Sequence, residues 1–177
     1  MHEPLSLRRN FSWTLAGNII YFASQFGILI ILAKLGTTQM VGRFSFGLAI
    51  CAPVMIFANM ALRPVQATDA KREYLFCDYL GLRLITTFLA LLVIATISFI
   101  GGYGKEISLV ILIVGIAKAF EAISDVYYGP LQQHERMDRI AKSLMIKGPL
   151  ALIIVGLLIW LTGDLIWGVI GLEQHAE

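Results

Sequence analysis

The sequence predicts an all-α integral membrane protein with five complete membrane-spanning helices and the start of a sixth. Apolar residues make up 58% of the 177 residues and charged residues 15%. The mean hydropathy of +0.77 is far above that of soluble proteins. The apolar residues also form runs of about 20, the length that an α-helix needs to cross a bilayer. The expected spans are residues 11–33, 43–66, 82–100, 107–129 and 144–161.

The first span follows an N-terminal segment, residues 1–10, that contains Arg8 and Arg9. A basic segment before an apolar run also begins a signal peptide. Residues 11–33 are too long for the apolar core of a signal peptide, however, and lack a small-residue cleavage site. The polar residues of this span share one helical face, which favours hydrogen bonds between helices or contact with a polar ligand. They are Thr14, Asn18, Tyr21 and Gln25.

The second span, residues 43–66, contains a proline in its middle and a polar face at one end. Pro53 removes a backbone hydrogen bond, so the helix is expected to bend there. Asn59, Arg63 and Gln66 share the polar face. Arg63 is a candidate for binding an anionic group, although extension toward lipid headgroups is the more common role of an arginine at the end of a span.

The next two segments contain no candidate residue for binding a ligand. Residues 67–81 are expected to form an interfacial helix with Thr68 or Asp69 at its N-terminus as the cap. The third span, residues 82–100, has only threonine and serine as polar residues once Arg83 is counted with its basic flank. This span is therefore expected to face lipid.

Charged residues interrupt the fourth span, residues 107–129. Lys118, Glu121 and Asp125 stand at positions i, i+3 and i+7 and lie within about 60° of one another around a helix. Such a stripe cannot face lipid, so we expect it to face a protein partner or a water-filled cavity. Lys118 and Glu121 can form an ion pair, which has a structural or a functional role. Asp125 is then the carboxylate without a nearby cation and a candidate for binding a proton, a sodium ion or a cationic ligand.

The C-terminal part begins with a basic loop that suits anionic headgroups or a pyrophosphate. The fifth span, residues 144–161, follows this loop. Residues 165–172 begin another apolar run, which is too short to cross a bilayer. They are expected to be the start of a sixth span in a truncated chain, before the polar tail of residues 173–177. The alternative is a fifth span that continues to Ile170.

Basic residues are unevenly distributed over the two sides of this predicted bundle. Cytoplasmic flanks are enriched in lysine and arginine, so the N-terminus, residues 1–10, is expected in the cytoplasm. Neither Cys51 nor Cys77 is placed for a disulfide, and no Cys/His cluster has the spacing of metal ligands. The basic residues of the N-terminal side are Arg8, Arg9, Arg63, Lys71, Arg72, Arg83, Arg136, Arg139, Lys142 and Lys147, against Lys34, Arg43 and Lys105 on the other side.

Three stretches resemble the N-terminal part of polysaccharide or O-antigen flippases, the polysaccharide transporter branch of the superfamily that also contains the multidrug and toxin extruders. They are residues 18–54, residues 57–70 and residues 124–150. The resemblance implies helices in two lobes around a central cavity. This chain matches the N-terminal lobe of that arrangement.

The resemblance implies the movement of an undecaprenyl-pyrophosphate-linked oligosaccharide between the leaflets of the bacterial inner membrane. A sugar with a pyrophosphate cannot cross hydrocarbon unaided and needs a polar, partly cationic cavity. Arg63 and Lys118 would attract the anionic linker, and Glu121 or Asp125 would couple cation binding to the inward and outward states. The residues expected to bind sugar hydroxyls are Asn18, Gln25 and Asn59.

The same resemblance implies the partners of the chain. They are the lipid-linked oligosaccharide, membrane lipids and other membrane proteins of glycan assembly. No cofactor, metal ion or nucleic acid is expected, and no catalytic residue.

Two other functions stay open at the level of sequence. One is a drug or cation antiporter of the same superfamily, for which an acidic cavity without Arg63 and Lys118 would be the stronger sign. The other is a membrane-embedded enzyme of glycan assembly, which usually needs a long polar loop or a nucleophile and base near one membrane face. No predicted outer loop is long enough for this. An inactive remnant is a third interpretation of a truncated chain.

Overall fold

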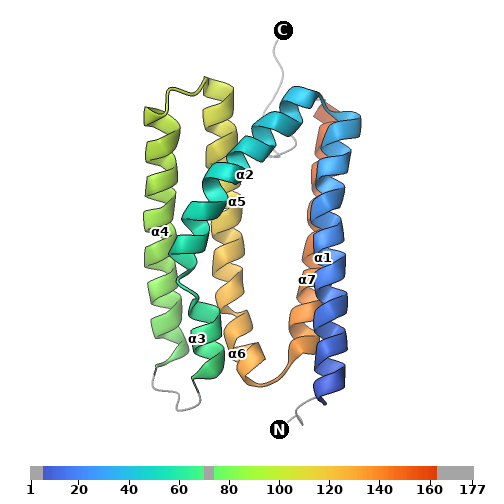
Figure 1. Ribbon diagram of the computed structural model, residues 1–177, viewed down its shortest axis with the longest axis vertical. Coiled ribbons are helices and arrows are strands. Elements are labelled where there is room, and N and C mark those ends of the chain that lie inside the picture. Colours follow the sequence, from blue (N-terminus) through green and yellow to red (C-terminus); the bar gives the residue numbers. More distant parts are fainter. Residues whose placement is uncertain (1–5, 70–73, 163–177) are drawn as a thin grey trace.

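The computed structural model describes residues 6–69 and 74–162, and within these ranges every regular element is a helix (Figure 1). Five segments are long and apolar enough to cross a membrane. The predicted all-α membrane fold with five spans is therefore confirmed. The expected start of a sixth span, at residues 165–172, and the polar tail lie outside the described residues. The helices are α1 (Leu7–Leu35), α2 (Thr38–Asn59), α3 (Leu62–Thr68), α4 (Phe76–Ile100), α5 (Lys105–Val126), α6 (Tyr128–Gln133) and α7 (Met137–Thr162).

Most helices are longer than the apolar runs that predict them. α1 begins at Leu7, α4 at Phe76 and α7 at Met137, each ahead of its expected span. Backbone hydrogen bonds continue into the polar flanks, whereas hydropathy marks only the part that lies in hydrocarbon. A helix prediction from hydropathy alone is therefore too short at such ends.

The segment between the second and third spans differs from the expected interfacial helix over residues 67–81. α3 ends at Thr68 and α4 begins at Phe76, so no single helix covers this range. Asp69 follows the last residue of α3 instead of capping the start of a helix. Its carboxylate accepts a hydrogen bond of 3.3 Å from the Tyr79 hydroxyl, which fixes the turn to α4.

The second span is interrupted at a position that the sequence pattern does not mark. α2 continues through Pro53, and the helix breaks at Met60 and Ala61. Both residues have left-handed backbones, with φ of 45° and 48°. Non-glycine residues rarely adopt this conformation, so the break is a defined feature. It separates Asn59 at the end of α2 from Arg63 in α3.

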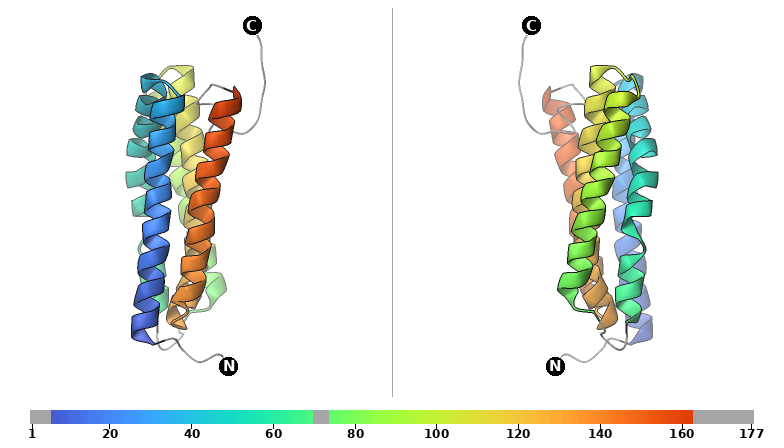
Figure 2. Two further views of the ribbon diagram at one scale, coloured as in Figure 1. Left: turned by 90° about the vertical axis from the view of Figure 1, so that its right-hand side faces the viewer. Right: turned by 90° about the vertical axis from the view of Figure 1, so that its left-hand side faces the viewer.

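Two groups of helices make up the bundle. α1 packs along α7, and we call these two helices the α1/α7 pair. α2, α4 and α5 pack against one another and form the α2/α4/α5 group. Figure 2 shows the pair from one side and the group from the other. The short helices α3 and α6 lie together at the end of the bundle that holds the start of α1.

The apolar core lies in the half of the bundle away from α3 and α6. Leu32, Cys51, Ile94 and Val110 have no exposed surface there and come from four different helices. Large apolar side chains also cover the outside, as a lipid environment permits. The half near α3 and α6 combines buried apolar residues, such as Val126 and Ile140, with the buried polar residues Gln66 and Arg83.

Glycines bring the backbones of α1 and α7 close together. A Cβ atom on Gly17 would lie 2.8 Å from the Cα atom of Ala141, and one on Gly148 would lie 3.1 Å from the Cα atom of Tyr21. Small residues of this kind are a common basis of helix packing in membranes. The α1/α7 pair is therefore held by backbone contact.

We expect Gly17→Ala to lower the free energy of unfolding by about 1–3 kcal/mol, because the added methyl group meets the backbone of Ala141 and forces the helices apart. Gly81→Ala is the matched control, since its methyl group meets no atom within 4 Å. That variant should be neutral or more stable by about 0.4–1 kcal/mol. Unfolding of both variants by SDS in mixed micelles measures the difference. Equal stabilities would contradict the close packing of α1 on α7.

Candidate functional site

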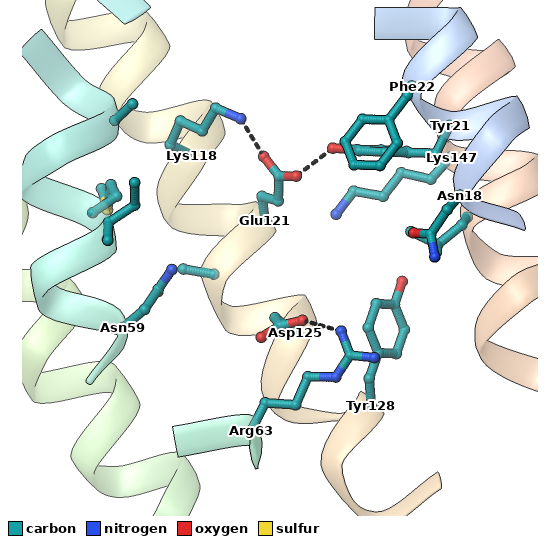
Figure 3. Close-up of a pocket in the computed structure, with 15 residues that line it drawn as sticks. Asn18, Tyr21, Phe22, Asn59, Arg63, Lys118, Glu121, Asp125, Tyr128 and Lys147 are labelled. Atoms are coloured by element: carbon teal, nitrogen blue, oxygen red, sulfur yellow. Dashed lines mark hydrogen bonds and ion pairs between the residues drawn. The ribbon is translucent and has the colours of Figure 1, made fainter. Parts of the chain in front are cut away.

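A cavity of about 420 Å³ lies between the α1/α7 pair and the α2/α4/α5 group, and we call it the polar pocket. Three cationic side chains and two carboxylates line it, so it carries an excess of positive charge. Six of the seven candidate residues predicted from the sequence line this one cavity (Figure 3). They are Asn18, Asn59, Arg63, Lys118, Glu121 and Asp125.

The expected ion pair within α5 is present. Lys118 Nζ lies 2.7 Å from Glu121 Oε2. The other carboxylate oxygen of Glu121 accepts a hydrogen bond from the Tyr21 hydroxyl of α1 (Figure 3). Glu121 therefore connects the α1/α7 pair with the α2/α4/α5 group across the pocket.

The prediction that Asp125 has no nearby cation is wrong. Its Oδ1 atom accepts a hydrogen bond of 2.9 Å from Arg63 Nη1, and its Oδ2 atom lies 3.8 Å from Arg83 Nη2. Both cations come from other helices, α3 and α4, and spacing along a single helix cannot reveal them. Asp125 therefore joins three helices.

Arg63 does not extend toward lipid headgroups, which was the favoured interpretation of its position. Besides its bond to Asp125, its Nε atom donates a hydrogen bond of 3.0 Å to Gln132. Its guanidinium also lies 5.4 Å from the centre of the Tyr128 ring. About 29% of the side chain is exposed, so the guanidinium is held in place and still reachable from the pocket.

Arg83 shows that α4 does not simply face lipid. Its side chain is only 1% exposed and donates a hydrogen bond from Nη1 to the amide oxygen of Asn59. A buried arginine needs such partners because an unpaired charge in this environment is costly. Thr87 could have indicated this polar face from the sequence, because it lies one helical turn from Arg83 on the same face and is also buried. Counting Arg83 with the basic flank hid this polar stripe.

Lys147 is a pocket residue that sequence reasoning assigned to the basic flank. It belongs to α7 and lines the polar pocket opposite Glu121 (Figure 3). Lys147 forms no ion pair or hydrogen bond with any residue of the ranges 6–69 and 74–162. Ser143 could have indicated this position, because it lies four residues earlier on the same helical face. In the structure its hydroxyl lies 2.8 Å from the hydroxyl of Tyr128.

The seventh candidate, Gln25, lies outside the polar pocket. It lines a second cavity of about 230 Å³ between α1, α2, α5 and α7, which we call the apolar pocket. The two pockets meet at four shared residues, which are Tyr21, Lys118, Glu121 and Lys147. No cluster of metal-binding side chains occurs among the residues that the structure describes.

We expect Tyr21→Phe to destabilise the protein by about 1 kcal/mol, because it removes the hydrogen bond to Glu121 that joins the two helix groups. Tyr103→Phe is the control, since the Tyr103 hydroxyl forms no hydrogen bond within the described ranges. Thermal unfolding of the two purified variants measures the effect. Identical midpoints would mean that the Tyr21 hydroxyl contributes nothing to the association of the groups.

Comparison with known proteins identifies the family of the chain. Residues 7–174 match the model of a family described as polysaccharide biosynthesis protein. The chain is also 32% identical over 146 residues to the capsular polysaccharide biosynthesis protein CapF of Staphylococcus aureus. That match covers 82% of this chain and 36% of the relative, so the chain spans about a third of the relative's length. No solved structure matches the chain. With its five apolar helices, the chain is a multi-pass membrane protein that belongs to the polysaccharide biosynthesis protein family.

Proposed function

We propose that the chain contributes to polysaccharide biosynthesis and export by moving a lipid-linked oligosaccharide, of the undecaprenyl-pyrophosphate type, across the membrane. The observation that carries this proposal is a polar pocket of about 420 Å³, with an excess of positive charge, between membrane-spanning helices. A cationic pocket between such helices lowers the cost of removing an anionic head from water.

The pocket residues divide into two chemical roles. Arg63 and Lys118 present cationic groups to the pyrophosphate linker, for which guanidinium and ammonium donors form strong charge-assisted hydrogen bonds. The amides of Asn18 and Asn59 line this cavity and suit sugar hydroxyls, whereas Gln25 lines the adjoining apolar pocket. The lipid tail stays in the surrounding hydrocarbon.

Glu121 is the residue that we assign to coupling. It bonds to Lys118 in its own helix and to Tyr21 in the α1/α7 pair. An anionic linker competes with the carboxylate for Lys118, so ligand binding changes the contact between the two helix groups. Cation or proton binding to Glu121 would act on the same contact.

The proposed location is the bacterial inner membrane with the N-terminus in the cytoplasm. α3, α6 and the start of α1 lie at one end of the bundle (Figure 1). Basic residues of the described segments at this end include Arg8, Arg9 and Arg136. The polar pocket reaches this end through Arg63, so it can receive a ligand assembled in the cytoplasm. Other membrane proteins of glycan assembly are proposed partners there.

The excess of cationic groups separates this proposal from its rivals. A drug or cation antiporter needs a cavity that attracts cations, and the polar pocket has the opposite balance. An enzyme of glycan assembly needs a free nucleophile with a base beside it. Within the described residues the carboxylates of the pocket are held in ion pairs instead.

Complementation tests the proposal. A bacterium that lacks its own flippase for O-antigen units would receive either this chain or the chain extended to the length of its relative, and surface polysaccharide would be measured. We expect the extended form to restore surface polysaccharide. Rescue by the short chain as well would mean that five spans assemble into a complete pathway. Failure of both forms despite membrane insertion would contradict the proposed function.

A further inference from the structure

The apolar pocket has walls that do not suit a sugar. α1, α2, α5 and α7 line its volume of about 230 Å³, and most of the lining residues are aliphatic. Ile28, Leu32 and Val114 are buried in this wall, and Leu48 and Val155 complete it. A glycan would lose its hydration along this aliphatic wall and find hydrogen-bonding groups only where the wall ends. A hydrocarbon chain would meet no such cost.

The end of the apolar pocket that meets the polar pocket has a different chemistry. Lys118 and Tyr21 are already bonded to Glu121 there. Lys147 is the cationic group of this junction that has no ion pair or hydrogen bond within the described residues. The junction holds the two lysines Lys118 and Lys147 against the single carboxylate of Glu121, so its net positive charge favours an anionic ligand group. The adjoining polar pocket leaves room for water around such a group.

We propose that the apolar pocket binds a single-chain anionic amphiphile, a long-chain fatty acid, with its carboxylate at Lys147 and its chain between Ile28, Leu48 and Val155. One chain is proposed because four helices surround a cavity with about half the volume of the polar pocket. This site shares Lys147 with the polar pocket, but lipid labelling reports on it and glycan export does not, so either proposal can fail without the other.

Photolabelling tests the proposal directly. The purified chain is placed in phosphatidylcholine nanodiscs with palmitic acid that carries a photoactivatable diazirine, and the labelled peptides are identified by mass spectrometry. We expect label on α1 near Ile28 and on α7 near Val155. Lys147→Gln should lower this labelling about tenfold, equivalent to about 1.4 kcal/mol of binding free energy. Lys147→Arg, which keeps the charge, should retain most of it.

Matched controls separate a carboxylate site from general contact with lipid. Lys142→Gln removes an exposed charge from the same helix and should leave labelling unchanged. The corresponding uncharged probe, diazirine-bearing hexadecanol, should label the native chain and Lys147→Gln equally. Equal palmitate labelling of the native chain and Lys147→Gln would overturn the proposed role of the charge.

A second pair of variants tests the cavity itself. Leu48→Trp fills the apolar pocket and should abolish labelling at Val155, whereas Leu84→Trp adds the same ring at a side chain that is 47% exposed and should not. Label that persists in Leu48→Trp, or that lies only on outward-facing residues such as Phe88, would overturn the proposed site.

Discussion

Replacing Asp125 by alanine should destabilise the protein by about 2–4 kcal/mol. The change removes the carboxylate that faces Arg63 at 2.9 Å and Arg83 at 3.8 Å. Arg83 is 1% exposed and cannot recover its hydration by a change of rotamer, so its charge would stay buried with only Asn59 as a partner. Loss of one member of a buried ion pair is costly for this reason. Arg63 is partly exposed and contributes less.

A second carboxylate offers the matched control for this prediction. Glu106 pairs with Arg43 at 2.5 Å, but its side chain is 59% exposed. Glu106→Ala should therefore cost less than about 1 kcal/mol. Unfolding by SDS in mixed micelles compares the two variants directly. If Asp125→Ala costs no more than Glu106→Ala, the pair between α4 and α5 does not support the fold.

A double variant identifies the source of the loss. Arg83→Met removes the buried charge and keeps an extended apolar side chain in its place. Combined with Asp125→Ala, it should be more stable than Asp125→Ala alone, because no unpaired guanidinium is left. A double variant as unstable as the sum of the two single variants would mean that the residues act independently.

The fold could be predicted because the bilayer imposes one strong rule on the chain. Each span must satisfy its own backbone hydrogen bonds, so an apolar run of sufficient length is a helix. The break at Met60 and Ala61 could not be predicted in this way, since neither residue is a glycine or a proline. Pro53, which did carry a signal, lies inside a continuous helix. Packing against neighbouring helices decides where a helix breaks. The pattern of a single sequence does not reveal this packing.

Within the candidate site, contacts inside one helix could be predicted from the sequence, whereas contacts between helices could not. The Lys118 and Glu121 pair was predictable because both residues lie on one helix at a spacing that brings them together. The partners of Asp125 were not, because they come from positions 62 and 42 residues away in the chain. Helical spacing describes one face of one helix. It cannot say which face of another helix will lie opposite.

Lys118→Ala should abolish glycan export in the full-length context while membrane insertion stays intact. The polar pocket is lined by Arg63, Lys118 and Lys147 against two carboxylates, so the change removes its excess of positive charge. The Glu121 carboxylate would also lose its ion-pair partner and face the cavity as a repulsive group for an anionic linker. Surface polysaccharide in the complementation strain measures export, and a fluorescent fusion measures insertion.

Three further variants distinguish ligand binding from simple charge neutralisation. Lys105→Ala removes an exposed charge at the opposite end of α5 and should export normally. Lys118→Arg keeps the charge and should export partially. The double variant Lys118→Ala with Glu121→Ala removes the repulsive carboxylate together with the lysine. If it regains export, Lys118 serves to neutralise Glu121; if it stays inactive, export needs a role of Lys118 or of Glu121 beyond their mutual neutralisation. Unchanged export in Lys118→Ala would remove this residue from the mechanism.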